Sequence, residues 1–379
     1  MLCLRPAQVD TSRRNALNIS SKRLFGGVAA ASLIVGLAAC APAPEKGDSG
    51  AEGGADFVPC IVSDAGGFDD RSFNQLSWEG VKKAADELGV ELKQAESNSE
   101  TDFGPNLESM VGEGCNAIVS VGFALSAATV ETAKANPDTD FILVDDAADN
   151  DFDGNKDADN VKPLLYNTAE AAFLAGYLSA GYSQAGKVGT FGGMEFPTVT
   201  IFMDGFAQGV AHYNSVKGTN VEVVGWDTAA ATGSFTGGFE ANQEAKSVAQ
   251  NILDQGVDVL LPVGGPIYQS ALQAIKESGR DVALIGVDAD LFQTDETTQD
   301  FVLTSILKNM DVSTYEAVIS SANGEFDAEA YVGTLDNGGV GIAPFHNFEA
   351  KVAPELVSEV DALKQEIIDG KVKVTSYLS

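Results

Sequence analysis

Aspartates and paired glycines recur where the strands expected from this sequence end. Asp64 follows "PCIVS", Asp145 follows "FILV" and Asp288 follows "VALIGV". Gly264 and Gly265 come directly after "VDVLLPV". A carboxylate accepts hydrogen bonds from hydroxyl and N–H groups and is a poor partner for an anion, while glycine lets a ligand approach the main chain. The pattern predicts a cleft that binds a neutral, polar ligand, although a single aspartate at a strand end is also a common helix cap.

The segment "VSDAGGFDDRSFNQ" contains the densest group of these polar residues. Its glycines at 66–67 permit a tight turn, and its aspartates at 69–70 shape that turn. Ser72 and Gln75 match a capping box that starts a helix over 72–88. We therefore interpret the segment as a ligand-reading loop on a rigid scaffold.

Two phenylalanines and one lysine extend the candidate site. Phe73 and Phe235 are candidate stacking platforms for a flat ring, although both are equally typical of core packing. Lys308, in "TSILKNM", supplies a cation suited to a hydroxyl group or to holding Asp288. The sequence has neither a GxxxxGK[ST] loop nor a GxGxxG turn after a strand. Together these features favour a polyhydroxylated or aromatic-plus-sugar ligand over a phosphorylated one.

Short β-branched runs alternate with amphipathic helices through the body of the chain, which predicts parallel sheets with right-handed crossovers. Ten strands in two groups indicate two doubly wound lobes. The ligand crevice of such sheets lies beyond the carboxyl ends of the strands. The expected strands are 57–63, 90–95, 117–121, 141–144, 161–166, 187–191, 221–225, 257–263, 282–287 and 301–306.

Composition narrows the class of protein. The chain has 379 residues and a formal net charge of −32, with 44% hydrophobic residues. A globular body is expected, and nucleic acid is excluded as a partner because phosphates require a basic face. The sequence has two histidines, so few residues are available to build a histidine-based metal site or catalytic triad. We expect no metal and no cofactor.

The N-terminus has the features of a lipoprotein signal. Basic residues precede a short apolar run that ends in "LAAC", so we expect residues 1–39 to be a signal peptide and Cys40 to be lipidated. An ordinary cleavage site is the alternative. Residues 40–56 are rich in Pro, Gly, Ala and acids, which predicts a flexible tether. The body would then be lipid-anchored on the extracytoplasmic face of the cell membrane.

Cys60 and Cys115 remain in the body of the chain. Cys60 lies in the first expected strand and Cys115 immediately precedes the third, and those strands are neighbours in a doubly wound sheet. The two cysteines therefore either pair as a disulfide or remain free thiols, and geometry decides between these states.

An acidic loop, "DNDFDGNKDADN", follows the fourth expected strand. Asp149, Asp151, Asp153 and Gly154 occupy positions 1, 3, 5 and 6 of a calcium-loop pattern, but position 12 is Asn160 in place of glutamate. We interpret the segment as a solvated acidic loop, with calcium binding as the alternative.

Seven segments in order resemble the basic membrane protein (BMP) family, whose members are substrate-binding lipoproteins of ABC importers and include purine nucleoside receptors. The segments are "DAGGFDDRSFNQLSWEG", "FILVDD", "AAFLAGYLSA", "VGTFGGMEFPTV", "LPVGGP", "IGVDAD" and "LTSILKNMD". The resemblance implies a type I periplasmic-binding-protein fold, in which two doubly wound parallel-sheet lobes are joined by a three-crossing hinge. We expect one lobe at 57–165 plus about 288–320 and the other at 166–287 plus about 321–379.

The resemblance also implies roles for the base-binding residues. Asp64 and Asp145 would accept hydrogen bonds from the base edge, with Asn74 beside them. Phe73 and Phe235 would stack on either side of the base.

The sugar half of the implied site falls on Gly265, Asp288 and Lys308, which would hold the ribose hydroxyls. The match at Phe235 is weaker because its segment is longer than the family pattern. Trp226 or Phe239 could supply that stacking face instead.

The function implied is capture of a nucleoside, with a purine expected, by hinge closure and its delivery to the permease and ATPase subunits of an ABC importer. We expect a monomer with no catalytic residues. A sugar or polyol receptor of the same fold is the alternative. A nucleoside-processing enzyme fits less well because no nucleophile–base pair with histidine is evident. A surface antigen would leave the polar strand ends without a purpose.

Overall fold

The computed structural model describes residues 56–378 of the chain. The predicted signal peptide (1–39), the lipidation site Cys40 and all but the last residue of the predicted tether (40–56) lie outside the described residues. Within 56–378, no helix combines the length and apolar character needed to cross a bilayer.

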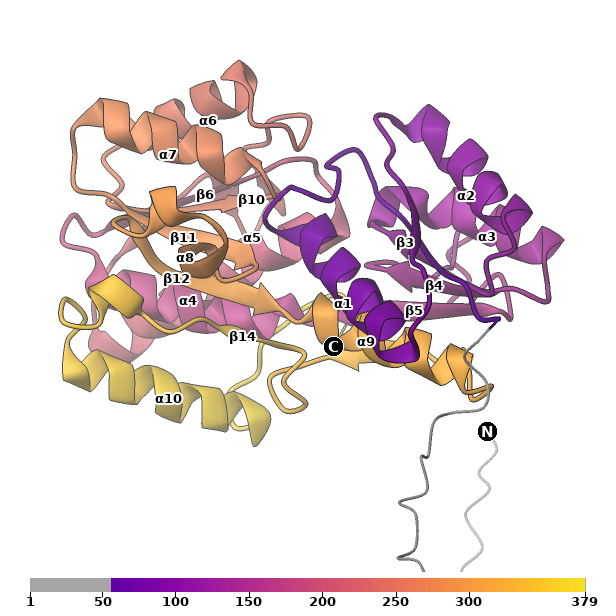
Figure 1. Ribbon diagram of the computed structural model, residues 1–379. Coiled ribbons are helices and arrows are strands. Elements are labelled where there is room, and N and C mark those ends of the chain that lie inside the picture. Colours follow the sequence, from indigo (N-terminus) through magenta and orange to yellow (C-terminus); the bar gives the residue numbers. More distant parts are fainter. Residues whose placement is uncertain (1–55, 379) are drawn as a thin grey trace, which may run out of the picture. The chain divides into compact units, whose positions relative to one another are not determined.

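Two six-stranded sheets form the framework of the body shown in Figure 1. Both sheets have the same winding order. In the first sheet, β1 lies between β2 and β3, and β4, β5 and β13 follow. In the second, β6 lies between β7 and β10, and β11, β12 and β14 follow. The first sheet comprises β1 (Pro59–Val62), β2 (Lys93–Ala95), β3 (Ala117–Val121), β4 (Asp140–Val144), β5 (Val161–Tyr166) and β13 (Tyr331–Gly333). The second comprises β6 (Lys187–Gly192), β7 (Glu222–Val224), β10 (Val259–Val263), β11 (Ala283–Asp288), β12 (Val302–Lys308) and β14 (Val340–Ile342).

The strand pairs are parallel except for β12 with β14 and the separate hairpin of β8 (Trp226–Asp227) and β9 (Thr232–Gly233). The central strands are buried along their length, which explains their unbroken apolar sequences. The prediction of two doubly wound, parallel-sheet lobes is confirmed. All ten expected strands are present, with the predicted ends for 117–121 and 161–166 and shifted ends for the others, whereas β8, β9, β13 and β14 were not predicted.

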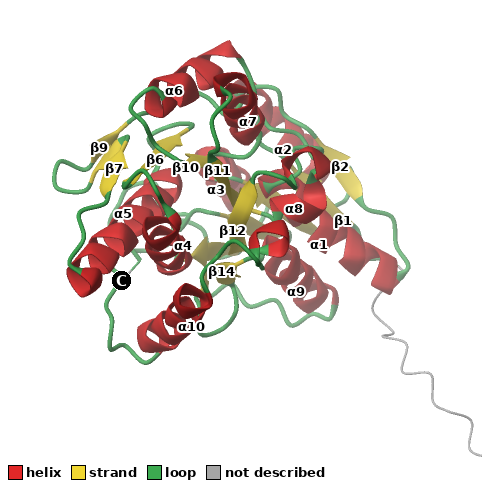
Figure 2. Cartoon of the chain, turned by 90° about the vertical axis from the view of Figure 1, so that its left-hand side faces the viewer, coloured by secondary structure: helices red, strands yellow, loops and turns green. Residues whose placement is uncertain are grey.

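Helices cover both faces of each sheet. In Figure 2, α6 and α7 lie on one side of β6, β10 and β11, and α4, α5 and α10 lie on the other. One apolar cluster packs α2 and α3 on the first sheet, a second packs α6 and α7 on the second sheet, and the largest continues from lobe to lobe beneath α1, α9, α4, α5 and α10. The helices are α1 (Phe73–Leu88), α2 (Phe103–Gly112), α3 (Ser126–Ala135), α4 (Thr168–Tyr182), α5 (Pro197–Lys217), α6 (Gln243–Leu253), α7 (Ile267–Ser278), α8 (Leu291–Thr294), α9 (Met310–Ala322) and α10 (Pro354–Ile368).

Three crossings join the lobes within the described residues: β5 to α4, β12 to α9, and β13 to β14. Backbone hydrogen bonds connect these crossings: the Asn167 backbone N–H donates to Gly333 O at 2.8 Å, and the Asn309 backbone N–H donates to Gly339 O at 3.0 Å. A Cβ on Gly339 would lie 2.3 Å from the Cα of Gly333, so this close approach requires glycine.

The predicted lobe boundary at about 288 is wrong. β12 pairs in parallel with β11, so residues 288–308 belong to the second lobe, and the chain returns to the first lobe between Lys308 and Met310. β13 also lies in the first sheet, which extends that lobe's last segment to 333. A buried apolar strand has the same pattern in either sheet, and therefore its sequence does not identify its partner.

Cys60 and Cys115 are joined by a disulfide, with their Cα atoms 6.0 Å apart. Cys60 lies on β1, and Cys115 lies two residues before β3, the neighbouring strand. The bond ties the beginning of the first sheet to the end of the α2 segment.

Reduction of this disulfide is expected to lower the free energy of unfolding by about 4 kcal/mol, because it releases a loop closed over 55 residues of sequence. Urea unfolding with and without a reductant measures the difference. The Cys60→Ser/Cys115→Ser variant should already have the lower stability and should not respond to the reductant. Equal stability of the oxidised and fully reduced wild-type protein would contradict the prediction.

Candidate ligand-binding site

A cavity of about 860 Å³, its mouth included, lies between the carboxyl ends of the two sheets. Residues after β1, β3 and β4 line it from the first lobe, and residues after β6 and β10 and at the ends of β11 and β12 line it from the second. This is the crevice where doubly wound sheets bind ligands. Seven predicted site residues line it: Asp64, Phe73, Asn74, Asp145, Gly265, Asp288 and Lys308.

A network of side chains organises the loop between β1 and α1. The buried Asp70 carboxylate accepts hydrogen bonds from the backbone amides of Ser72, Asn74 and Gln75 at 2.9–3.0 Å. It thereby satisfies the first amides of α1, which would otherwise be buried without partners. The predicted Ser72–Gln75 capping box is therefore wrong. Asp70 fills that role, and the Ser72 hydroxyl donates elsewhere.

Asn74 lines the cavity, but its side-chain amide is engaged in hydrogen bonds within the loop. Its Nδ2 donates to Asp64 Oδ1 at 2.7 Å and to Asp70 Oδ2 at 3.2 Å, and its Oδ1 accepts from the Asp64 amide at 3.3 Å. The Gly66 amide also donates to Asp64 Oδ1, at 3.0 Å. With these bonds, Asn74 orients the Asp64 carboxylate and has little capacity left to bind a ligand directly.

The remaining oxygen of Asp64, Oδ2, lies beside Gly122, whose φ is 115°. A Cβ at Gly122 would lie 2.9 Å from Oδ2, so a glycine is required for the strand end to approach this carboxylate.

Lys308 connects the two lobes inside the cavity. Its Nζ lies 2.6 Å from Asp145 Oδ2, in the first lobe, and 3.9 Å from Asp288 Oδ1, in its own lobe. The rings of Phe73, Tyr166 and Phe202 surround the ammonium group at centroid distances of 5.1–5.4 Å. Because Lys308 and Asp145 are both buried, removing either partner of this pair would leave an uncompensated charge in the interior.

Asp145 and Asp288 occupy equivalent positions in the two lobes. Each lies at the carboxyl end of the fourth strand of its sheet in chain order, β4 in the first lobe and β11 in the second. Both have left-handed backbones, with φ values of 69° and 65°, a strained state that clusters at functional sites. The Ser72 hydroxyl lies 3.0 Å from Asp288 Oδ2 and 3.1 Å from Val287 O. The first lobe therefore contacts the second lobe's aspartate directly.

Burial changes the acidity of these carboxyl groups. It raises the pKa of Asp64 to about 6 and that of Asp288 to about 6, because the ionised form loses its hydration. Burial likewise raises the pKa of Asp70 and Asp145, although Lys308 acts in the opposite direction on Asp145.

Aromatic rings from both lobes form the apolar wall. Phe123 and Phe196 approach at 5.0 Å, and Phe196 and Phe239 at 6.0 Å, between ring centroids. Within the described residues, the lining includes Phe239 but not Phe235. The backbone of Phe235 bridges to Gly192, and its ring lies over that glycine.

The prediction at Phe235 is therefore corrected in favour of Phe239, one of the two alternatives considered, whereas Trp226 also lies outside the lining. Sequence reasoning missed Phe196 and Phe202. Phe196 could have been found, because it closely follows the end of β6, where cleft residues are expected.

The charges around the cavity indicate which ligands it can hold. Of the described residues that line it, Lys308 alone is basic, against the acids Asp64, Asp70, Glu100, Asp145 and Asp288. Surplus carboxylates favour a ligand rich in hydroxyl and N–H donors and disfavour an anion. The aromatic wall adds contact for a flat ring.

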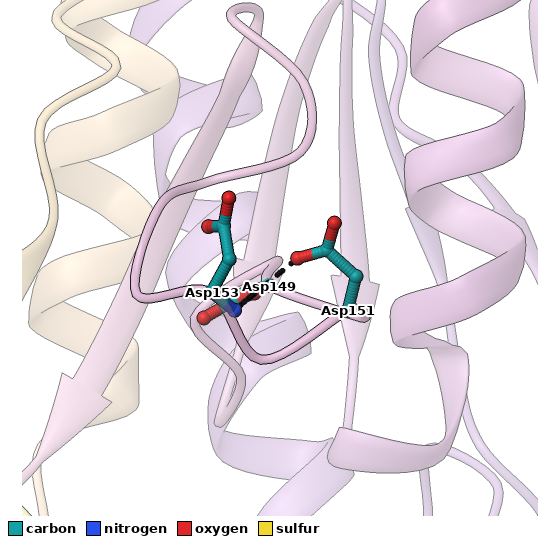
Figure 3. A group of neighbouring side chains, drawn as sticks. All are labelled: Asp149, Asp151 and Asp153. Carbon is teal, nitrogen blue, oxygen red and sulfur yellow. Dashed lines mark hydrogen bonds between the residues drawn. The ribbon is translucent and has the colours of Figure 1, made fainter.

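The acidic loop does not line the cavity. Figure 3 shows Asp149, Asp151 and Asp153, whose carboxylate oxygens lie within 4.8 Å of one another. The Asp149 carboxylate already accepts from the amides of Asp153 and Gly154, at 3.1 and 2.9 Å, and the Asp151 carboxylate also accepts from the Asp153 amide. Asp151 and Asp153 are exposed, and both interpretations of this segment, a solvated acidic loop and a calcium site, stay predictions.

Comparison with known families gives one match over most of the chain. The model of the Bmp family, described as PnrA-like substrate-binding proteins of ABC transporters, matches residues 57–377.

Individual relatives agree with this match. The nucleoside-binding protein BmpA of an ABC transporter in Lactococcus lactis is 30% identical over 92% of this chain and 97% of its own length. Basic membrane protein A of Borreliella burgdorferi is 29% identical over 82% of this chain and 86% of its own length. Among solved structures, a solute-binding protein of an ABC transporter system from Aeropyrum pernix is 27% identical, with a TM-score of 0.72 over 85% of this chain and 94% of that one.

The raised pKa values predict a stability that falls with increasing pH. The carboxyl groups of Asp64 and Asp288 each have an ordinary pKa of 3.8 and a pKa of about 6 in the folded protein. Between about pH 4 and pH 6, the folded protein holds more protons than the unfolded chain. The ligand-free protein should therefore lose stability as the pH rises through this range. The variant Asp64→Asn keeps an oxygen acceptor without the charge, so it should melt higher at pH 7 and show a flatter slope. Melting temperatures from about pH 4 to pH 7 measure both.

The exposed Asp300 provides a matched control. Asp300→Asn should retain the wild-type slope, whereas an unchanged slope in Asp64→Asn would show that this carboxyl group is not the source.

Proposed function

Because the chain belongs to the Bmp family of PnrA-like substrate-binding proteins of ABC transporters, we propose that its own ligand is a nucleoside, with a purine expected. Members of this family bind substrates for transporters and are not enzymes. The observation that carries the proposal is the cavity between the lobes, where surplus buried carboxylates face an aromatic wall. A nucleoside offers both complements: hydroxyl and N–H donors on an uncharged molecule, and a flat ring.

In this proposal the base lies in the half of the cavity formed by the first lobe. Asp64 and Asp145 accept hydrogen bonds from its edge, and Asn74 holds Asp64 in orientation. Phe73 and Phe239 supply the ring faces, both being part of the lining. The name of the Lactococcus relative, a nucleoside-binding protein, supports this assignment.

The sugar lies against the second lobe. Asp288 accepts from ribose hydroxyls, Lys308 donates to one, and the Gly265 backbone, with φ of 49° and room beside it, permits close approach. The ligand thus contacts both lobes, and its binding energy stabilises the closed form. Closure about the three crossings would present the loaded form to the permease and ATPase subunits.

Anchoring completes the proposal. A lipid on Cys40 and the tether after it would hold the body, as a monomer, near the transporter on the extracytoplasmic face. The support for this step is the "LAAC" sequence and the family's place in ABC importers.

A thermal-shift series with nucleosides, free bases, pentoses and polyols tests the ligand class. Nucleosides at 100 times their Kd should stabilise the protein by about 2.7 kcal/mol, because a ligand that binds the folded state alone shifts the unfolding equilibrium. Free bases and sugars should shift the melting temperature much less. Stabilisation by polyols but not by nucleosides would support the sugar-receptor alternative and contradict the proposal.

Paired variants locate the site within the same series. Asp288→Ala should abolish the shift by nucleosides while the protein remains folded, and the exposed Asp300→Ala should keep the shift. A wild-type shift in Asp288→Ala would place the ligand elsewhere.

A further inference from the structure

Two consecutive residues of the ligand-reading loop reach from the first lobe to the second. Ser72 bonds to Asp288, which lines the cavity. Its neighbour Arg71 points to the outside, where its Nη1 lies 2.9 Å from Asp295 Oδ1. Asp295 follows α8 and belongs to the second lobe. Arg71 does not line the ligand cavity within the described residues, so this ion pair joins the lobes without facing the ligand.

The acceptor of the pair is fixed in advance by its own lobe. Asp295 is 4% exposed. Its carboxylate accepts from the Tyr268 hydroxyl at 2.8 Å, from the Thr297 amide at 3.0 Å and from the Thr297 hydroxyl at 2.8 Å. All of these donors lie in the second lobe, so Asp295 keeps its orientation whether or not Arg71 is present. The first lobe supplies the positive charge when the two lobes meet.

Arg71 is held in an uncommon conformation to make this contact. Its φ is 58°, in the left-handed region that a non-glycine residue enters at a cost. The residues on either side, Asp70 and Ser72, are both buried and bonded. Arg71 is therefore the chain neighbour of Ser72, which contacts Asp288, so separation of the lobes would break both interlobe contacts, the Arg71–Asp295 pair and the Ser72–Asp288 bond.

Charge on the whole chain gives this pair added importance. The sequence has 55 acidic residues and 23 basic ones, so two acidic lobes repel each other as they approach. A positive charge on one lobe that meets a buried carboxylate on the other offsets part of this repulsion. The arginine side chain is 47% exposed, so dissolved salt should weaken the effect.

We propose that the Arg71–Asp295 pair is a closure latch that increases ligand affinity without contacting the ligand. This inference rests on the proposed function for its affinity measurement, but the latch itself concerns the equilibrium between open and closed lobes. Loss of the latch lowers the closed population, and the apparent affinity falls in proportion. Because the contact exists when the lobes have met, the loss should appear mainly as faster dissociation.

Isothermal titration of a purine nucleoside into the wild type, Arg71→Gln, Asp295→Asn and the double variant tests the latch. We expect each single variant to bind roughly three- to tenfold more weakly at low salt. The double variant should be no weaker than the worse single one, because both substitutions remove the same interaction. The difference between the wild type and Arg71→Gln should shrink as salt is added. Wild-type affinity in Arg71→Gln, or losses that add in full in the double variant, would overturn the proposal.

Lys246→Gln is a matched control. Lys246 pairs with Glu277 at 2.6 Å on the partly exposed surface, and both residues lie in the second lobe. Its loss should leave affinity unchanged.

Hydrogen–deuterium exchange separates failure of the latch from failure of the nucleoside proposal. Without ligand, Arg71→Gln should exchange faster than the wild type over 64–75 and 289–300 but not over α10. If the wild type binds no nucleoside, the proposed function fails and the latch is judged on this exchange. Equal exchange in both proteins would overturn the latch.

Discussion

The contact between Lys308 and Asp145 is the constraint on which the site depends. It joins the end of β12 in the second sheet to the end of β4 in the first, and it lies at the point where the chain crosses between lobes. A buried lysine requires a buried carboxylate, and loss of either partner costs about 3–5 kcal/mol. The pair thereby fixes how the two sheets face each other. Because Asp145 engages Lys308, the other carboxylates that line the cavity must accept hydrogen bonds from the loop or from a ligand.

The two lobes contribute to the site in parallel ways because they wind in the same order. Each places an aspartate with a left-handed backbone at the end of its fourth winding strand, Asp145 in one and Asp288 in the other. Each aspartate is then contacted from the opposite lobe, Asp145 by Lys308 and Asp288 by Ser72. Because each of these contacts crosses between the lobes, both aspartates lose a partner when the lobes separate. A ligand that bonds to them acts on groups that already belong to the interface between the lobes.

The sequence was sufficient to predict most of the fold and the acidic part of the site, because both depend on local patterns. Long buried strands have unbroken apolar runs, and residues at their carboxyl ends meet at the cleft, which located Asp64, Asp145 and Asp288. The predictions that failed depend on contacts between distant segments. Ser72 does not cap α1 because Asp288, from the other lobe, engages its hydroxyl. Phe235 is displaced from the cavity by a backbone bridge to Gly192. The short strands β13 and β14 have too little pattern to be recognised.

The central claim is that the cavity selects an uncharged ligand by its surplus of acceptors around one lysine. Isothermal titration of one nucleoside and its 5′-monophosphate at pH 7.5 tests this claim most directly. The nucleoside should bind, and the monophosphate should bind at least about 100-fold more weakly, since a phosphate among buried carboxylates loses roughly 2.7 kcal/mol or more. Equal or tighter binding of the monophosphate would contradict it.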